Sequence, residues 1–447
     1  MSTTPLQVFS EGTLAGWAER AAARATERRE AGWALERRRR AAGIAAALPF
    51  PSREHELWRR TDFRTIENEL QSLDPFASVP PARNFDDLPA GLIARLAQGA
   101  PTALIAQRGA DVVLEQTHPD LAKQGVIVMS MDRALREHGA LLEKRLGALI
   151  DPDYDRWSAI ADAVRSGGAF ISVPDGVEAA LPVRILHWID SGGQLVAPHT
   201  VIVLGRGARL TVIEEQLSEA AEAASLHAGA TEVFLGDDSK LVYATLQDWA
   251  RNVYHYSNQR AQLGRNSELQ WIQTLLGGRM VKTNSYFDLA GPGAQAFVHG
   301  FMFGDSRQHF HLHTLQRHLV DHCTSDLMIK GCLKDRARSV YQGLIQVAEG
   351  AQRTDAYQAN RNLLLSGTAR ADSIPGLEIL ANDVRCTHGA TIGTVDDEQM
   401  YYLMARGLER PEAQRLIVEG FFTPVLDRIP LESVREQLRA AIQHKIG

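Results

Sequence analysis

The stretch from Gly205 to Leu210 reads GRGARL, and related stretches recur as GDDSKL from Gly236, GRNSEL from Gly264 and GPGAQA from Gly291. Each stretch places a turn, a small residue and a polar residue before the apolar residue that opens a β-rich run. The spacings between them are 31, 28 and 27 residues. Such a repeat is typical of stacked β units, each of which buries its apolar face only against its neighbours. A β-sandwich would also give short strands between turns, but the recurring turn favours a solenoid, that is, a β-helix.

The segments around these β-rich runs differ in composition and predict four regions. We expect an N-terminal helical region with a Pro-rich connector at residues 1–100 and a mixed α/β region at 101–169. A β-helix core is expected at 170–393 and a C-terminal helical domain at 394–447. The predicted fold class is therefore mainly β.

Helix signals mark both ends of the chain. Residues 13–47 contain no proline and are rich in Ala, Arg and Glu, which predicts helix. Within them, the run from Arg37 to Arg40 is offset by nearby glutamates and indicates a solvated helix face rather than a nucleic-acid contact. Prolines then cluster between Asp74 and Pro89 and indicate a connector.

The C-terminal segment carries signals for three helices. Thr394 or Asp396 is a candidate N-cap of the first helix, and Gly407 is a candidate stop. Pro411 is expected to begin the second helix. The third is expected from about residue 431 to 444, with apolar residues at helical spacing on one face: Leu431, Val434, Leu438 and Ile442.

Composition limits the function classes. The chain has 447 residues, a formal charge of -6 and a pI near 6.2, so nucleic acid is not an expected partner. No run of 18 apolar residues predicts a membrane span, and no charged segment followed by an apolar one predicts a signal peptide. We therefore expect a cytoplasmic location. Cys323, Cys332 and Cys386 contain no CxxC pair, so neither a disulfide framework nor a closed thiolate metal site is predicted.

Two stretches partly match phosphate-binding motifs, but neither match is complete. GGRMVKT at residues 277–283 lacks the glycine directly before the lysine of a Walker motif, and no GxxxxGK occurs in the chain. Gly291, Gly293 and Ala296 spell GxGxxA, but the residues that follow predict a strand where a dinucleotide fold needs a helix. We therefore expect no ATP site in this chain.

Two groups of residues are candidate metal ligands. HFHLH places His309, His311 and His313 on one face of a strand, where they predict either a metal site or a polar row. Same-face neighbours lie about 7 Å apart, so the strand would have to bend to let them share an ion. Cys386 and His388 have the same spacing and would supply half of a tetrahedral site, with a partner protein supplying the rest. The alternative for that pair is a buried cysteine beside a hydrogen-bonded histidine.

The C-terminal part of the sequence resembles a known family. NRNLLLSGTARADSIPGLEILANDVRCTHGATIGTVDDEQMYYLMARGL at residues 360–408 is similar to the signature region of the SufB/SufD family of iron-sulfur cluster assembly proteins. TSDLMIKGCLKDRARSVYQGLIQV at 324–347 matches the preceding segment, and the similarity extends more loosely to residues 53–63. Leu403 stands where the SufB branch carries a cysteine, and CTHGAT is similar to the CSHGAT of SufD. The chain therefore resembles the SufD-like branch.

This resemblance implies a right-handed parallel β-helix with flanking helices, in a non-catalytic scaffold subunit. It implies pairing with SufB, and docking of SufC, an ABC-type ATPase that would hydrolyse ATP, on the C-terminal helices. It also implies that His388, with Cys386 as a neighbouring candidate, helps to hold a transient iron-sulfur cluster shared with SufB. A homodimer of the isolated chain through the same surface is a further expectation.

Two functions from other classes remain as alternatives at this point. One is a stand-alone β-helix metalloprotein that uses His309, His311 and His313. The other is a carbohydrate-active β-helix enzyme, for which fold analogy is the only support because no carboxylate cluster can be picked out from the sequence.

Overall fold

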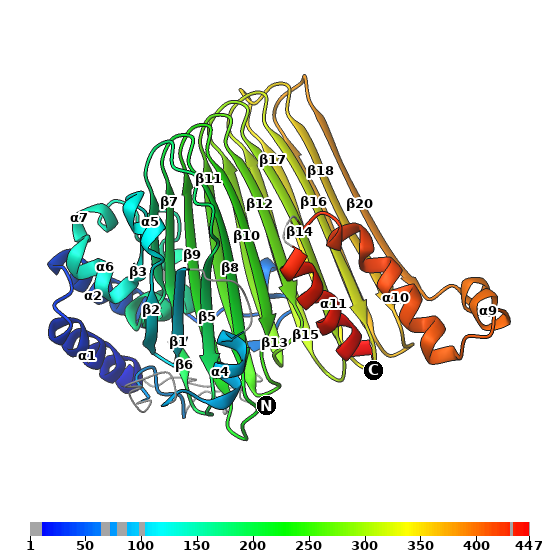
Figure 1. Ribbon diagram of the computed structural model, residues 1–447, viewed down its shortest axis with the longest axis horizontal. Helices are drawn as coiled ribbons and strands as arrows, with labels where there is room; N and C mark the ends of the chain where they lie inside the picture. The colour runs from blue at the N-terminus through cyan, green and yellow to red at the C-terminus, as the bar shows by residue number, and fades with distance from the viewer. Residues whose placement is uncertain (1–10, 64–71, 78–86, 98–102, 430–431, 447) are drawn as a thin grey trace.

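The computed structural model describes residues 11–63, 72–77, 87–97, 103–429 and 432–446. Two ten-stranded sheets lie face to face and run the length of the molecule (Figure 1). The first sheet contains, in spatial order, β2 (Asp111–Gln116), β1 (Ala103–Arg108), β5 (Val183–Ile189), β8 (Arg209–Ser218), β10 (Lys240–Asp248), β12 (Glu268–Leu275), β14 (Gln295–Gly304), β16 (Thr324–Leu333), β18 (Asp355–Leu364) and β20 (Arg385–Thr394).

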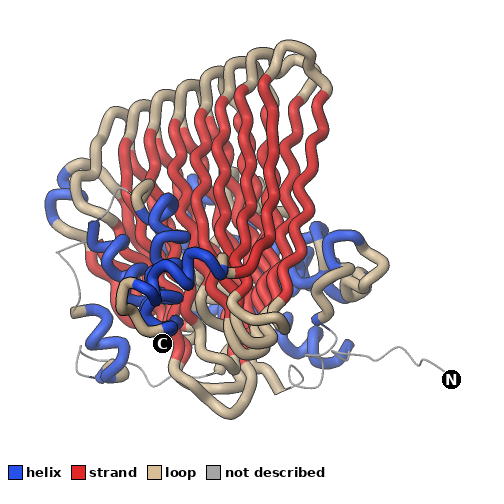
Figure 2. The backbone as a smooth tube through the Cα atoms, turned by 90° about the vertical axis from the view of Figure 1, so that its right-hand side faces the viewer, coloured by secondary structure: helices blue, strands red, loops and turns tan. Residues whose placement is uncertain are grey.

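The second sheet is built in the same way from the intervening segments. Its strands, from the same end as β20, are β19 (Arg370–Ile379), β17 (Arg338–Val347), β15 (His309–His318), β13 (Met280–Leu289), β11 (Val253–Leu263), β9 (Ser225–Leu235), β7 (His199–Leu204), β4 (Ala169–Val173) and β3 (Ile127–Ser130), with β6 (Leu195–Val196) paired to β9. From β8 onward the chain alternates between the sheets, and every strand pairs in parallel with the strand one coil later. Figure 2 shows the resulting stack of coils. The predicted parallel β-helix is confirmed.

The spacing of the repeat in the sequence equals the offset between paired residues of neighbouring strands in the first sheet. Arg209 pairs with Lys240, Lys240 with Glu268, and Glu268 with Gln295, so successive coils are offset by 31, 28 and 27 residues. These offsets equal the spacings between the turn stretches because each stretch is the turn that leads into a first-sheet strand. The turn therefore recurs once per coil.

Apolar side chains from both sheets fill the space between them. Their columns run along the solenoid: Leu210, Leu241 and Leu269 lie in one column of the first sheet. In the next column the rings of Tyr243 and Trp271 lie 4.2 Å apart between centroids. Because each coil covers the apolar face of its neighbour, an interior coil has no exposed core, whereas a terminal coil does.

Helices cover the outer faces of both sheets. The second sheet carries α1 (Glu11–Glu27), α2 (Gly32–Ala47), α6 (Met131–Glu137), α7 (Gly139–Leu142) and α8 (Arg156–Ala163) near its N-terminal end. The first sheet carries α4 (Ala90–Leu96) beside β1 and β5, and α10 (Arg410–Leu426) and α11 (Glu432–Ile446) beside its later strands. The remaining short elements are α5 (Pro119–Lys123), η1 (Glu56–Trp58), η4 (Pro152–Tyr154) and α9 (Asp397–Ala405).

The N-terminal segment differs from the sequence expectation in two ways. Residues 13–47 form two helices, because the chain turns back at Arg29 in the left-handed conformation, with φ at 56°. The run from Arg37 to Arg40 is not simply a solvated face: Arg38 is buried and forms an ion pair with Glu30 at 2.8 Å. Arg37 likewise pairs with Asp162 at 2.8 Å. This part of the helix therefore packs α2 against the body of the protein.

The C-terminal helices follow the signals in the sequence. Asp396 caps α9 by accepting a hydrogen bond from the Glu398 N–H at 2.8 Å, while Thr394 is the last residue of β20. Gly407 follows α9 with φ at 97°, a conformation that favours glycine. Leu438 and Ile442 of α11 are buried as predicted. Leu431 and the side chain of Val434 lie outside the described residues.

The four predicted domains stay a prediction. Strands β1 to β3, from the segment predicted as a separate α/β region, are hydrogen-bonded into the same two sheets as the solenoid. Part of the Pro-rich connector, residues 78–86, lies outside the described residues. No helix in the described ranges has both the length and the apolar composition that crossing a membrane requires.

Candidate functional site

The solenoid ends at an open coil. β20 is the last strand of the first sheet and β19 is the last strand of the second, so each pairs with another strand along one side only. In Figure 1 the free edge of β20 lies at the end of the molecule opposite the N-terminal helices. A free strand edge offers unpaired N–H and C=O groups to a partner. We call this surface, made by residues 370–394, the open end.

Cys386 and His388 lie on the inward-facing side of this last coil. Cys386 is in register with the buried Ala356, and His388 is in register with the buried Gln358. The His388 column continues back through Trp271 of the core, so this column points between the two sheets. His388 is exposed and Cys386 is half-buried, because no further coil covers them. The predicted common face of the two side chains is therefore present, and it opens outward along the solenoid axis.

The open end also carries exposed apolar side chains. Leu377 and Ile379 of β19 are each 37% exposed, and Ile392 of β20 is 47% exposed. The three residues continue inward-facing columns that are buried in earlier coils; for example, Leu377 follows Ile345, which is fully buried. A terminal repeat normally carries a polar outer face or a cap. An apolar one with free strand edges is typical of a surface that another protein covers.

The donor set of the open end suits a soft metal but is incomplete. Burial, with a smaller contribution from Asp355, raises the pKa of the Cys386 thiol, so the isolated chain holds it protonated at neutral pH. A metal ion would have to displace that proton, because the thiolate is the ligand. One thiolate and one imidazole complete only half of a tetrahedral site. Across the described residues, no group of three or more His, Cys, Asp and Glu side chains is arranged to hold a metal ion.

The histidine row on β15 lies elsewhere, on the outer face of the second sheet. His309, His311 and His313 share that face, as their spacing predicts. Each ring is hydrogen-bonded to another side chain of this chain: Thr61 for His309 and His311, Gln342 for His311, and Tyr286 for His313. Thr61 belongs to the N-terminal segment, so the row fastens that segment to the solenoid. The metal role of this row stays a prediction.

Buried histidines give a testable pH dependence of stability. Burial lowers the pKa of His255 to about 3 and that of His318 to about 4. The unfolded chain therefore binds more protons than the folded chain below about pH 6.5. Full stability should be present above that pH, and each such histidine should remove ~1.4 kcal/mol per pH unit as the pH falls toward its folded pKa.

Urea unfolding at pH 7.5, 6.0 and 5.0 measures this effect. The free energy of unfolding should fall steadily over that range. The variant His322→Gln, at an exposed turn, should show the same fall. An unfolding free energy that is constant from pH 7.5 to 5.0 would contradict the assignment of neutral buried rings.

Sequence reasoning missed two features of the surface. The apolar residues of the open end lie in ordinary strand patterns, and nothing local marks their coil as the last. Four arginines from separate turns, Arg251, Arg279, Arg307 and Arg336, line one cleft. The signal for it in the sequence is the regular spacing of these arginines, 28, 28 and 29 residues, which is about one coil.

Comparison with known proteins identifies the family. Residues 187–421 match the model of the SUF system FeS cluster assembly, SufBD core domain. The iron-sulfur cluster assembly protein SufD of Bacillus subtilis is 29% identical over 425 residues, covering 93% of this chain and 95% of that protein. SufB of the same organism is 28% identical over 334 residues, covering 75% and 72%. The match includes the open end and more than half of the chain, and the chain therefore belongs to the SufBD family of iron-sulfur cluster assembly proteins.

Proposed function

We propose that this chain is a SufD-type scaffold subunit that pairs with a SufB-type subunit through its open end. The observation that carries the proposal is the uncapped last coil, which presents Cys386 and His388 together with exposed apolar side chains. A related solenoid that meets this coil would cover the apolar residues and pair the free strand edges. It would also bring the ligands that the site lacks. Leu403, in place of the cysteine of the SufB branch, favours the SufD-type role.

The cluster is cargo in this proposal. Two partners each contribute donors to an iron-sulfur cluster that forms at their interface and is then passed on. Thiolate and imidazole both ligate such clusters. His388 is the main donor from this chain because it is exposed, and Cys386 is the second candidate.

The C-terminal helices are the proposed docking surface for a SufC-type ATPase. Tyr401, Tyr402 and Met404 on α9 are 75%, 58% and 41% exposed. Tyrosine and methionine side chains are enriched in protein interfaces. Helix α9 follows β20 directly, so movement of a docked ATPase would act on the open end. Catalysis of ATP hydrolysis belongs to that partner, and the predicted cytoplasmic location stays part of this proposal.

Replacing His388 with alanine tests the site. We expect the complex with the SufB-type and SufC-type proteins to assemble normally and to retain less than half of its iron and sulfide after anaerobic purification. His322→Ala is the matched control, because His322 is an exposed histidine in a turn of the solenoid. Iron and sulfide contents equal to wild type in the His388 variant would remove His388 from the site without affecting the pairing proposal.

A further inference from the structure

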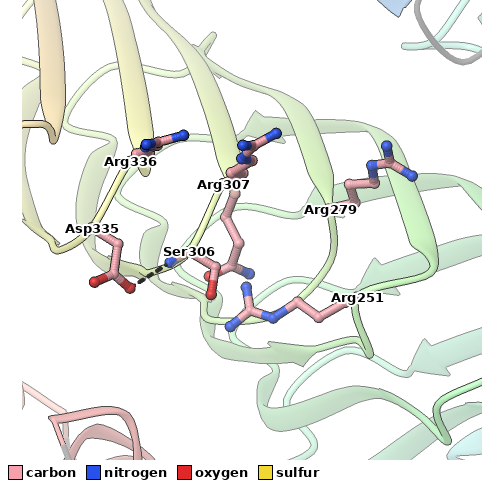
Figure 3. Close-up of a pocket in the computed structure, with 7 residues that line it drawn as sticks. Arg251, Arg279, Ser306, Arg307, Asp335 and Arg336 are labelled. Atoms are coloured by element: carbon pink, nitrogen blue, oxygen red, sulfur yellow. Dashed lines mark hydrogen bonds between the residues drawn. The ribbon is translucent and has the colours of Figure 1, made fainter.

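A cleft of about 680 Å³ lies along one edge of the solenoid, away from the open end. It is formed by turns that carry the chain from the first sheet to the second, in four successive coils. Its lining residues are Arg251, Arg279, Ser306, Arg307, Gln308, Asp335 and Arg336. We call it the arginine cleft. Figure 3 shows Arg279, Arg307 and Arg336 projecting from neighbouring turns, with Arg251 and Ser306 beside them.

The lining is strongly positive. The lining residues carry four guanidinium groups and one carboxylate, that of Asp335, in a chain whose formal charge is -6; Arg251 is also paired with Asp305, which is not a lining residue. Asp335 accepts a hydrogen bond from the Ser306 N–H at 2.8 Å, which holds it on the loop (Figure 3). A concave site lined by one sign of charge concentrates counter-ions of the other sign. The cleft is therefore suited to an anion.

Arg307 and Arg336 stand one above the other. The pairing of His309 with Arg338 puts them at equivalent positions in adjacent coils, whose backbones lie about 4.8 Å apart. Both side chains are exposed, and within the described chain neither guanidinium forms an ion pair. Like charges at such a separation repel each other. An anion bound between them would relieve that repulsion.

The other side of the cleft is held in place. Arg251 forms an ion pair with Asp305, which also accepts a hydrogen bond from Lys445 of α11 at 3.2 Å. Lys445 donates a second bond to Gln308 at 3.0 Å, and the Gln308 amide donates to the Gly278 carbonyl at 2.7 Å. This network fixes the side of the cleft that carries Arg251 and Gln308 and ties it to the last helix. A ligand would therefore contact one fixed side of the cleft and, on the other side, the exposed side chains of Arg307 and Arg336.

We propose that the arginine cleft binds a small polyphosphate, a molecule with two or three linked phosphate groups. A guanidinium group matches phosphate oxygens with two parallel hydrogen bonds, so Arg307 and Arg336 would hold one phosphate, and the next phosphate would lie toward Arg251. The volume lies within the range of about 300 to 1,000 Å³ that is usual for small-molecule sites. The phosphate chain can belong to an inorganic polyphosphate or to a nucleoside triphosphate. The proposal covers binding alone and depends neither on the open end nor on a SufB partner.

Calorimetric titration of the full chain with tripolyphosphate and, separately, with ATP tests the proposal. We expect one site per chain and an affinity at least tenfold weaker in the double variant Arg307→Gln, Arg336→Gln. The control is Arg206→Gln, Arg265→Gln, which removes the same charge from exposed turns at the opposite edge. The control should bind as wild type does. Stronger binding of tripolyphosphate points to an inorganic ligand, and stronger binding of ATP points to a nucleotide.

A second variant protects the test against misfolding and against a simple charge effect. Arg307→Lys, Arg336→Lys keeps both charges and loses the paired hydrogen bonds, so its affinity should fall between that of wild type and that of the glutamine variant. Failure of both probes to bind at 1 mM concentration (about the weak limit for a specific site) would overturn the proposal. Equal weakening in the Arg206, Arg265 control would overturn it too. Loss of partner assembly in the Arg307, Arg336 variant without any polyphosphate binding would assign the cleft to an acidic protein surface instead.

Discussion

Replacing Leu377 and Ile392 with aspartate should abolish pairing with a SufB-type subunit, with at least a 100-fold loss of affinity. Both side chains lie at the open end, where they are 37% and 47% exposed in the isolated chain. A partner that covers them would have to bury two carboxylates without counter-charges, and such burial costs several kcal/mol for each group. The affinity of the purified chains for each other, measured by biolayer interferometry, gives the result.

The control for this prediction is Leu141→Asp. Leu141 is 53% exposed on α7, at the other end of the solenoid. This variant also replaces an exposed apolar side chain with aspartate, but on a surface outside the proposed interface, so the affinity for the SufB-type subunit should be unchanged. Because Leu377 and Ile392 already contact solvent, the double variant should keep the circular dichroism spectrum of the wild type. Normal pairing by a folded Leu377, Ile392 variant would place the interface elsewhere.

Replacing Glu232 with alanine should cost about 3 to 5 kcal/mol of stability, the usual cost of breaking a buried ionic or hydrogen-bonded network. Glu232 of β9 is fully buried. Its carboxylate accepts hydrogen bonds from the backbone N–H groups of Leu149 at 2.6 Å and Ile150 at 3.0 Å, and it lies 2.8 Å from the His199 ring. Gly147 donates a further backbone bond to it. One side chain thus anchors the segment after α7 to the second sheet.

Urea unfolding at pH 7.5 measures this cost, and limited proteolysis locates it. The Glu232 variant should be cut first within residues 131–150, because their anchoring acceptor is gone. Glu178→Ala is the matched control, since the Glu178 side chain is 74% exposed and lies 4.0 Å from Arg209, and it should change stability by less than about 0.5 kcal/mol. An unfolding midpoint equal to wild type in Glu232→Ala would show that the segment is held by its apolar contacts alone.

The fold could be predicted from the sequence because the signals that specify it are local and recur in successive coils. Every coil needs the same turn before its first-sheet strand, so the turns at Gly205 and Gly236 report the register directly. The caps of α9 are local too: Asp396 bonds to a residue two positions away. The break between α1 and α2 at Arg29 was missed because the residue is not glycine, although its φ is positive.

The candidate site could be predicted only in part from the sequence, because it depends on residues that are far apart in the chain. The spacing of Cys386 and His388 predicts their common face, but their exposure depends on which coil is the last. One partner of the histidine row, Thr61, lies about 250 residues away in the chain. The arginine cleft collects one to three residues from each of four turns. Long-range arrangements of this kind follow from the register between coils, which cannot be read from a single sequence.

Native mass spectrometry of the anaerobically purified complex tests the central claim most directly. The tagged chain would be co-expressed with the SufB-type and SufC-type proteins of the same organism, and intact masses would be recorded with and without release of iron and sulfide. We predict one species that contains all three proteins and carries iron and sulfide, and the same proteins with less iron and sulfide when His388 is alanine. A tagged chain found only at its own mass, or at twice that mass, would contradict the account.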